Sequence, residues 1–252
     1  MAAMRGYDST SYGDGFADVY DDWYAEVTDV DATTARVVAT LGSDAGRVLE
    51  LGVGTGRLAL PLADRNIDVV GVDSSQAMLD RLADRQRDRP HRVTAVCGDM
   101  ATELPDGPFD VALVAYNTLF NLLGDGEQQA CFHAVAERLA PGGAFIVEAV
   151  VPDETAQAGS DVSVRSMAVD RVVLSVSDHR PDQRRTSGQF VEFTESGGVR
   201  LRPWSIRWAS VDDLDAMAAS AGLALDTRFA NMAGDEFDEH STQHVSVYRA
   251  PR

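Results

Sequence analysis

The chain has 252 residues, 44% of them hydrophobic, which is enough for one large domain with a real core. It carries 40 acidic residues against 22 basic ones, all of them arginine, and its net charge is −18 at pH 7. A surface this acidic repels phosphate backbones, so we expect no nucleic acid partner. No stretch approaches the roughly 20 apolar residues of a membrane span. No signal peptide is recognisable either, so we expect a cytoplasmic protein with no membrane partner.

No metal site is expected. Cys97 and Cys131 lie far apart and match no metal-ligand spacing, so both are predicted to be buried, reduced thiols. His240 and His244 stand among three acids in the segment 235–244. The two histidines would face one metal ion if they lay on a helix, four residues apart. A helix is not expected just before a strand, so this segment is predicted to be a loop without metal.

The first half of the chain alternates helices and strands. Residues 1–30 are rich in Gly, Asp and Tyr and predict a loop with a short helix. Helices are then predicted at 31–41, with Asp31 as N-cap, and at 57–65, 75–86 and 127–140. Short apolar strands are predicted at 47–51, 68–73, 92–99, 109–116 and 144–151. This alternation is typical of a buried parallel sheet with helices on both faces.

The pattern changes after residue 151. Residues 152–209 alternate strand-like runs with polar turns, including a hairpin turn at 196–198, and predict an antiparallel β-meander. A helix with a Ser210–Asp213 capping box follows, and then two strands that are close enough to pair. We therefore expect an N-terminal segment (1–30), a main domain (31–151 and 210–252) and a β insertion (152–209).

The stretch VLELGVGTGRLALPLA, residues 48–63, places three glycines between a strand and a helix. Such a turn brings backbone amides close to a ligand at the positive end of a helix. One candidate ligand is a dinucleotide, because GTGRLA from Gly54 onward matches G-x-G-x-x-G/A. Asp73, 17 residues after Gly56, then stands where a ribose-binding acid belongs. Taken alone, this motif is weak.

The other candidate is S-adenosylmethionine, supported by five motifs in order. These are ELGVGTG (50–56), GVDSS (71–75), GDM (98–100), FDVALVAYNTLFNLL (109–123) and LAPGGAFIVE (139–148). With the final strand pair, they resemble the class I S-adenosylmethionine-dependent methyltransferases. The resemblance implies an α/β fold, a Rossmann-like doubly wound seven-stranded sheet with its last strand antiparallel. Here the antiparallel β-meander would be an insertion after the fifth strand.

The resemblance also implies roles for individual residues. Glu50 would accept the methionine ammonium, and Asp73 would accept both ribose hydroxyls. Asp99 would accept from the adenine amine, with the Met100 backbone against the ring, and Arg57 is a candidate partner for the cofactor carboxylate. The full set of expected cofactor-binding residues is Tyr20, Glu50, Gly52, Gly54, Gly56, Arg57, Asp73, Ser74, Asp99, Met100 and Tyr116.

Within this superfamily the chain most resembles small-molecule N-methyltransferases of the amino-sugar and glycine or sarcosine types. The segment YGDGFADVYDDWY (12–24) is similar to their tyrosine-bearing cover over the cofactor, in which Tyr12 would orient the nucleophile. The chain departs from the amino-sugar pattern at Asn121, where those enzymes place a histidine. Asparagine can orient a substrate but cannot accept a proton at neutral pH, so Tyr12 and Asn121 are the expected catalytic residues.

The expected substrate-binding residues are more scattered. In RPWSIRWAS, strand alternation would place Trp204 and Trp208 on one face and Arg207 on the other. A tryptophan wall suits a sugar or an aromatic ring, and an arginine suits a carboxylate or phosphate; alternatively, both tryptophans pack the meander onto the main sheet. The expected substrate-binding set is Tyr24, Asn117, Trp204, Arg207 and His240. By resemblance the insertion could also form a homodimer surface.

The sequence therefore predicts a methyltransferase that transfers a methyl group from S-adenosylmethionine to a small-molecule amine or hydroxyl, leaving S-adenosylhomocysteine. We expect a role in specialised metabolism. Two alternatives remain open at this point. A nicotinamide-dependent oxidoreductase would have its glycine motif in the usual register and no reversed final hairpin. A non-catalytic cofactor-binding subunit would keep the glycines and lose a shaped pocket.

Overall fold

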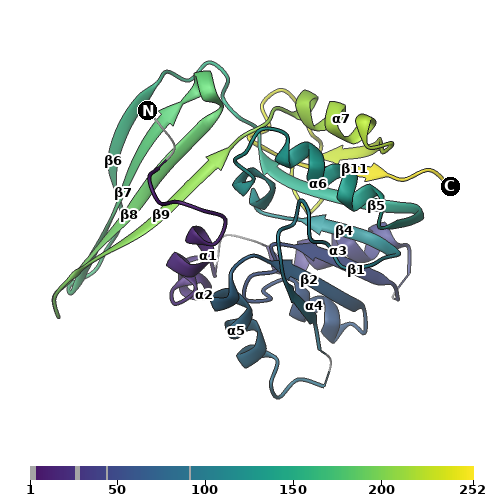
Figure 1. Ribbon diagram of the computed structural model, residues 1–252, viewed down its shortest axis with the longest axis horizontal. Coiled ribbons are helices and arrows are strands. Elements are labelled where there is room, and N and C mark those ends of the chain that lie inside the picture. Colours follow the sequence, from purple (N-terminus) through teal and green to yellow (C-terminus); the bar gives the residue numbers. More distant parts are fainter. Residues whose placement is uncertain (1–3, 26–28, 44, 91) are drawn as a thin grey trace.

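The computed structural model describes residues 4–25, 29–43, 45–90 and 92–252. Its main domain is built on a seven-stranded sheet in the order β10-β11-β5-β4-β1-β2-β3 (Figure 1). Its strands are β1 (Arg47–Leu51), β2 (Asp68–Asp73), β3 (Thr94–Cys97), β4 (Phe109–Val114), β5 (Leu139–Val150), β10 (Ala224–Phe229) and β11 (Gln243–Arg249). β11 alone runs opposite to the other six strands: its pairings with β10 and β5 are antiparallel, and all other pairings in this sheet are parallel. The predicted fold, with a reversed final strand, is confirmed.

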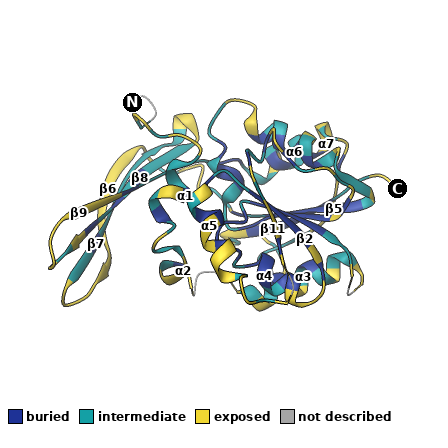
Figure 2. Cartoon of the chain, turned by 60° about the horizontal axis from the view of Figure 1, so that its bottom comes forward, coloured by how far each residue is buried: buried dark blue, intermediate teal, exposed yellow. Residues whose placement is uncertain are grey.

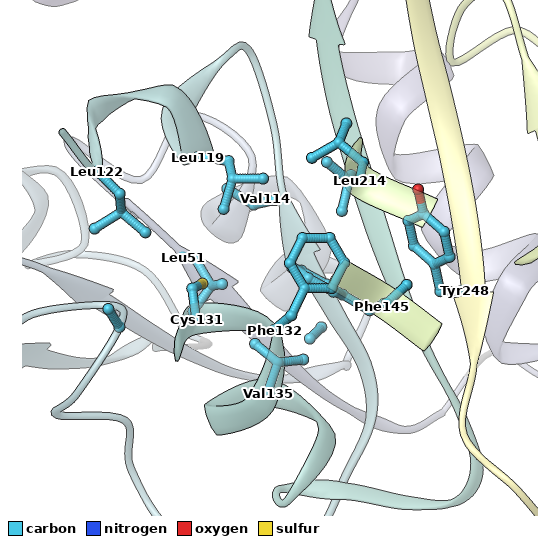
Figure 3. Close-up of a cluster of buried hydrophobic side chains, with 14 of the residues drawn as sticks. Leu51, Val114, Leu119, Leu122, Cys131, Phe132, Val135, Phe145, Leu214 and Tyr248 are labelled. Carbon is cyan, nitrogen blue, oxygen red and sulfur yellow. The ribbon is translucent and has the colours of Figure 1, made fainter. Parts of the chain in front are cut away.

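Helices cover both faces of this sheet, because its central strands are apolar on both sides. One face packs against α3 (Val30–Leu41), α4 (Ala59–Asp64) and α5 (Gln76–Arg85), and the other against α6 (Glu127–Ala136) and α7 (Val211–Ser220) (Figure 2). On the second face Phe132 contacts Phe145 and Tyr248 edge-on, with ring centroids 5.1 and 5.7 Å away (Figure 3). The predicted capping box of Ser210 and Asp213 is confirmed at the start of α7.

A second sheet holds β6 (Gly159–Met167), β7 (Arg171–Arg180), β8 (Arg185–Thr194) and β9 (Val199–Arg207), with the 3-10 turn η2 (Pro181–Gln183) between β7 and β8. Its four strands are all antiparallel and paired in chain order, as the predicted meander requires. The short helices α1 (Ser11–Phe16) and α2 (Tyr20–Trp23) lie between this sheet and the main domain (Figure 1). No helix in the described part of the chain is long and apolar enough to cross a membrane.

Three sequence-based expectations about local structure are wrong. The side chain of Asp29, not Asp31, caps α3 by accepting from the Ala32 amide at 2.8 Å. Cys97 is exposed, because β3 is an edge strand of the sheet, whereas Cys131 is buried as expected. The two tryptophans do not share a face of one strand.

The two tryptophans belong to different clusters because β9 ends at Arg207, before Trp208. Trp208 is 7% exposed and packs into the main core beside α6 and α7. Trp204 packs under the second sheet beside Phe190, with ring centroids 6.1 Å apart. The packing alternative therefore holds for Trp208, which joins the insertion to the main domain.

Candidate active site

The glycine turn follows β1, and its glycines meet different requirements. Gly54 has φ +54°, and a Cβ there would meet no atom closer than 4.0 Å, so its missing side chain opens toward a cavity. Gly56 has φ +78°, and a Cβ there would lie 2.3 Å from a methyl of Leu82. Gly54 is therefore suited to close approach by a ligand. Gly56 serves helix packing and lines neither of the two cavities described below.

A first cavity, called here the wide cavity, lies over the ends of β1 and β2. It contains half of the 18 predicted site residues: Tyr12, Tyr20, Gly52, Gly54, Asp73, Ser74, Asp99, Met100 and Asn121. These residues come from the N-terminal segment and from the loops after β1, β2, β3 and β4. The carboxyl ends of parallel strands bring those loops together at one edge of the sheet.

Asp73 ends β2 and organises the floor of the wide cavity. Its carboxylate accepts the Gly54 amide at 2.8 Å and the Ser75 amide at 2.9 Å. Burial raises the pKa of Asp73, while these two amides oppose the rise. The same side chain thus fixes the glycine turn and the start of α5, and it faces the cavity with its remaining acceptor capacity.

A second, narrow cavity adjoins the first and shares Tyr20, Gly52 and Thr118 with it. Glu50 lines it, is 4% exposed, and has one carboxylate oxygen that accepts no hydrogen bond from the described residues. Burial raises the pKa of Glu50 to about 8, although the charge of Arg57 opposes the rise. A buried carboxylate oxygen without a partner fits a cationic ligand group that would restore its ionised form.

Arg57 and Tyr116 complete the narrow cavity. The guanidinium carbon of Arg57 lies 5.7 Å from the ring centroids of both Tyr20 and Tyr116. Its Nη1 donates to the Tyr24 carbonyl at 3.3 Å, which leaves further donors available for a carboxylate. The narrow cavity therefore offers the carboxylate of Glu50 to a ligand ammonium and the guanidinium of Arg57 to a ligand carboxylate. Those are the two charges of an α-amino acid moiety.

Comparison with known proteins shows the family to which the chain belongs. A family model described as a methyltransferase domain matches residues 48–143. A cypemycin N-terminal methyltransferase from Streptomyces sp is 30% identical over 240 residues, covering 91% of this chain and 96% of that protein. The solved CcbJ methyltransferase from Streptomyces caelestis is 40% identical, with a TM-score of 0.89 over 98% of this chain and 100% of its own.

The chain belongs to the S-adenosylmethionine-dependent methyltransferases. The same fold, at 22% identity and a TM-score of 0.65, is seen in CalS10, an amino pentose methyltransferase from Micromonospora echinaspora solved with S-adenosylmethionine bound. That match covers 98% of this chain and 99% of CalS10. The resemblance, the enzyme class and the cofactor predicted from the sequence are confirmed. The oxidoreductase alternative, which excluded a reversed final hairpin, is wrong.

The N-terminal segment of this methyltransferase lines the wide cavity and bonds to the elements around it. Ser75 Oγ donates to Asp14 at 2.6 Å, Thr55 Oγ1 donates to Asp21 at 2.6 Å, and Arg85 Nη1 lies 3.0 Å from Asp21. Ser74, predicted to bind cofactor, donates its hydroxyl to the Ser9 carbonyl at 2.8 Å. The predicted cover is thereby joined to α5 and to the glycine turn.

Several predicted substrate residues lie outside both cavities. Asn117 uses its side-chain oxygen to accept the Val150 amide at 2.7 Å, which ties the end of β4 to β5. Arg207 is paired with Asp125 at 2.5 Å and also donates to the Leu123 carbonyl. The His240 side chain is 84% exposed, and Trp204 is packed as described above. The structure does not bring these residues together into one surface.

The aromatic residues of the N-terminal segment, in contrast, converge with Tyr116. Tyr24 lies 4.9 Å from Tyr20 and 5.9 Å from Tyr116, and Tyr12 stacks on Phe16 at 4.5 Å, all between ring centroids. Sequence reasoning missed Glu148, whose carboxylate accepts the Tyr116 amide at 3.0 Å and so fixes that ring's backbone. Glu148 is the acid at the end of the LAPGGAFIVE motif, but nothing in the sequence indicated that it would bond to the Tyr116 amide.

Proposed function

We propose that this methyltransferase transfers the methyl group to the nitrogen of a small-molecule amine. The observation that carries the proposal is a set of four tyrosines, called here the tyrosine group. Tyr20 and Tyr116 line the narrow cavity, Tyr24 contacts both of them, and Tyr12 lines the wide cavity. Aromatic faces attract ammonium ions, and tyrosine hydroxyls can hold an amine by hydrogen bonds. Burial raises the pKa of Tyr20 to about 12 and that of Tyr12 well above its usual value.

These raised pKa values favour an amine over a hydroxyl acceptor. A tyrosine that stays protonated at neutral pH can orient a nucleophile but cannot act as its base. S-adenosylmethionine supplies a methyl group already activated on a sulfonium. The residues of this chain therefore have to align the amine lone pair and exclude water. The N–C bond forms as the C–S bond breaks, and the aromatic faces stabilise the positive charge that appears on nitrogen before its proton leaves to solvent.

We propose that the cofactor lies across both cavities. Glu50 and Arg57 would hold the ammonium and carboxylate of its methionine part in the narrow cavity. Asp73 and Ser74 would face the ribose, and Asp99 with the Met100 backbone the adenine. Tyr12 and Asn121, which line the wide cavity, would orient the acceptor. The unpartnered oxygen of Glu50 and the open space at Gly54 support this placement.

The relatives support the choice of nitrogen. The name of the cypemycin relative states an N-terminal methyltransferase. KedS8, a sugar N-methyltransferase from Streptoalloteichus sp ATCC 53650, shares the fold at 21% identity and a TM-score of 0.68, with 100% of both chains covered. On the same grounds we propose a role in specialised metabolism.

The first test is calorimetric titration with S-adenosylhomocysteine, with NAD and NADH in parallel, followed by an acceptor screen. Amines, amino sugars and phenols would each be incubated with labelled S-adenosylmethionine, and methyl transfer and product mass recorded. We expect micromolar binding of S-adenosylhomocysteine alone and N-methylated products. Transfer to phenols and not to amines would contradict the proposal, as would binding of the nicotinamide cofactors alone.

Other expectations remain predictions. They are the division into segments 1–30, 31–151 with 210–252, and 152–209; a cytoplasmic location; no nucleic acid partner; and a homodimer through the insertion. The last concerns the exposed apolar side chains of the edge strand β6 and the turn after it: Val162, Val164, Met167 and Val169. Size-exclusion chromatography with light scattering would test it, and a monomer at micromolar concentration would contradict it.

A further inference from the structure

Arg165 stands apart from the other arginines in the strands of the second sheet. Each of the six others in those strands has a carboxylate or carbonyl partner: Arg171, Arg180, Arg185, Arg200, Arg202 and Arg207. The side chain of Arg165 has neither an ion pair nor a hydrogen bond to any described residue, and it is exposed. Five guanidinium donors thus remain available, in a chain with 40 acidic residues that could have paired with them.

A β-bulge aims this side chain. The pairing of β6 with β7 shifts between Val164 and Ser166, so Arg165 is the extra residue without a cross-strand partner. Bulges redirect side chains and are over-represented next to active sites. Here the guanidinium carbon lies over aromatic rings, 4.5 Å from the centroid of Phe190, 5.2 Å from Trp23 and 5.4 Å from Tyr24.

Those rings connect Arg165 to the cofactor site. Tyr24 contacts both Arg165 and Tyr116, and Tyr116 lines the narrow cavity. Burial raises the pKa of Tyr116, and the charges of Arg57 and then Arg165 oppose that rise. The positive field of Arg165 therefore reaches the ring beside which the acceptor amine would be methylated.

We propose that Arg165 binds an anionic group, a carboxylate or a phosphate, carried by the acceptor amine, and so selects acceptors that have one. The inference rests on the proposed N-methyl transfer. A stacked guanidinium keeps its planar fork free for two parallel hydrogen bonds to such a group. The chain as a whole repels anions at net charge −18, so an anionic acceptor needs a local cation of this kind. Arg207, which the sequence favoured for this role, is already paired with Asp125.

The test uses matched acceptors and the full-length protein. Sarcosine, L-proline and L-phenylalanine are each compared with their amides, and O-phosphoethanolamine is compared with ethanolamine. The kcat/KM of methyl transfer is measured for each compound. The Kd of each is also measured calorimetrically on protein saturated with S-adenosylhomocysteine, which reports binding even where no transfer occurs. The carboxylate and phosphate arms distinguish the two forms of anion.

We expect the wild type to favour the charged member of at least one pair by about 10- to 100-fold, as one lost charge-assisted bond pair implies. The preference should appear in KM more than in kcat, because the contact is remote from the reacting atoms. Arg165→Gln should equalise the pair, and Arg165→Lys should restore part of the preference. The matched control Arg180→Gln removes a charge from the same sheet and should behave as the wild type.

Two results would overturn the inference. One is that, in every pair, the charged and the neutral acceptor bind and react equally well, or that neither of them binds. The other is an Arg165→Gln variant that loses both members of a pair equally, which would mean a packing role. Its Kd for S-adenosylhomocysteine should stay unchanged and serves as the folding control. Failure of the proposed function is distinct, since it would show as methylated phenols without methylated amines in the acceptor screen.

Discussion

Arg202 on β9 holds Asp18 of the N-terminal segment with two hydrogen bonds, at 2.6 and 3.1 Å, across 184 residues of sequence. The same guanidinium donates to the Gly15 carbonyl at 2.6 Å and to Glu192 at 2.9 Å, and its side chain is 1% exposed. The hydrogen bond from Arg202 is the main cause that lowers the pKa of Asp18. The N-terminal segment, which lines the wide cavity, is therefore anchored to the second sheet by a buried arginine.

Replacing Arg202 should loosen that segment. Arg202→Met would leave Glu192, 7% exposed, without its buried partner, so we expect a loss of about 3–5 kcal/mol in unfolding free energy. Limited proteolysis should cut within residues 4–25 faster than in the wild type. The control Arg200→Gln removes the ion pair between the same Asp18 and an arginine side chain that is 63% exposed, so it should cost under about 1 kcal/mol. Equal effects of the two variants would show that burial does not set the strength of this contact.

The raised pKa of Glu50 predicts pH-dependent cofactor binding. In the free protein its pKa is about 8, so the side chain is protonated at pH 6, whereas an ammonium group requires the carboxylate. Binding then releases a proton, and affinity for S-adenosylhomocysteine should rise up to tenfold per pH unit below 8 and level off above it. Calorimetry from pH 6 to 8.5 checks this. Glu50→Gln should bind weakly with a flat profile, and an unchanged slope in that variant would exclude Glu50 as the cause.

The same shift has a consequence for the ligand-free protein. Between pH 4.5, the ordinary pKa of the group, and about 8, folded Glu50 holds a proton that the unfolded chain has lost. Its contribution to unfolding free energy therefore falls as pH rises through that window. Denaturant titrations at several pH values should show the Glu50→Gln variant losing less stability toward pH 8 than the wild type does.

The two glycines of the turn should respond differently to alanine. Gly54→Ala strains a positive φ by about 1 kcal/mol and places a methyl in the wide cavity, so S-adenosylhomocysteine affinity should fall more than tenfold with little change in Tm. Gly56→Ala forces Leu82 and Leu60, both 0% exposed, to move, so stability should fall by about 2–4 kcal/mol. Thermal unfolding and calorimetry on both variants separate the effects. A pure affinity loss in Gly56→Ala would contradict its packing role.

Asp73→Asn should lose most cofactor affinity. If Asp73 holds the ribose diol, removing its charge weakens two charge-assisted hydrogen bonds, and Kd for S-adenosylhomocysteine should rise about 100-fold. Asp226→Asn, which breaks an exposed pair with Arg249, is the matched control and should bind normally. Asp73→Asn also removes an acceptor from one of the two backbone amides, which affects every ligand alike. A ribose-deoxygenated analogue should therefore lose less affinity in the variant than S-adenosylhomocysteine does, and an equal loss for the two ligands would place the diol elsewhere.

Local patterns in the sequence determined the main domain and its cofactor. The apolar strands, the glycine turn and the acids that follow β1, β2 and β3 are contiguous signals, and parallel pairing alone brings their ends to one edge. The acceptor side was decided only by tertiary structure. The sequence alone made three residues candidates for substrate binding: Arg207, Asn117 and Trp208. In the folded chain each of them instead contacts a residue far away in the sequence. No sequence pattern pointed to Arg165. Its guanidinium is unpaired because a bulge redirects the side chain and because folding packs Trp23, Tyr24 and Phe190 against it.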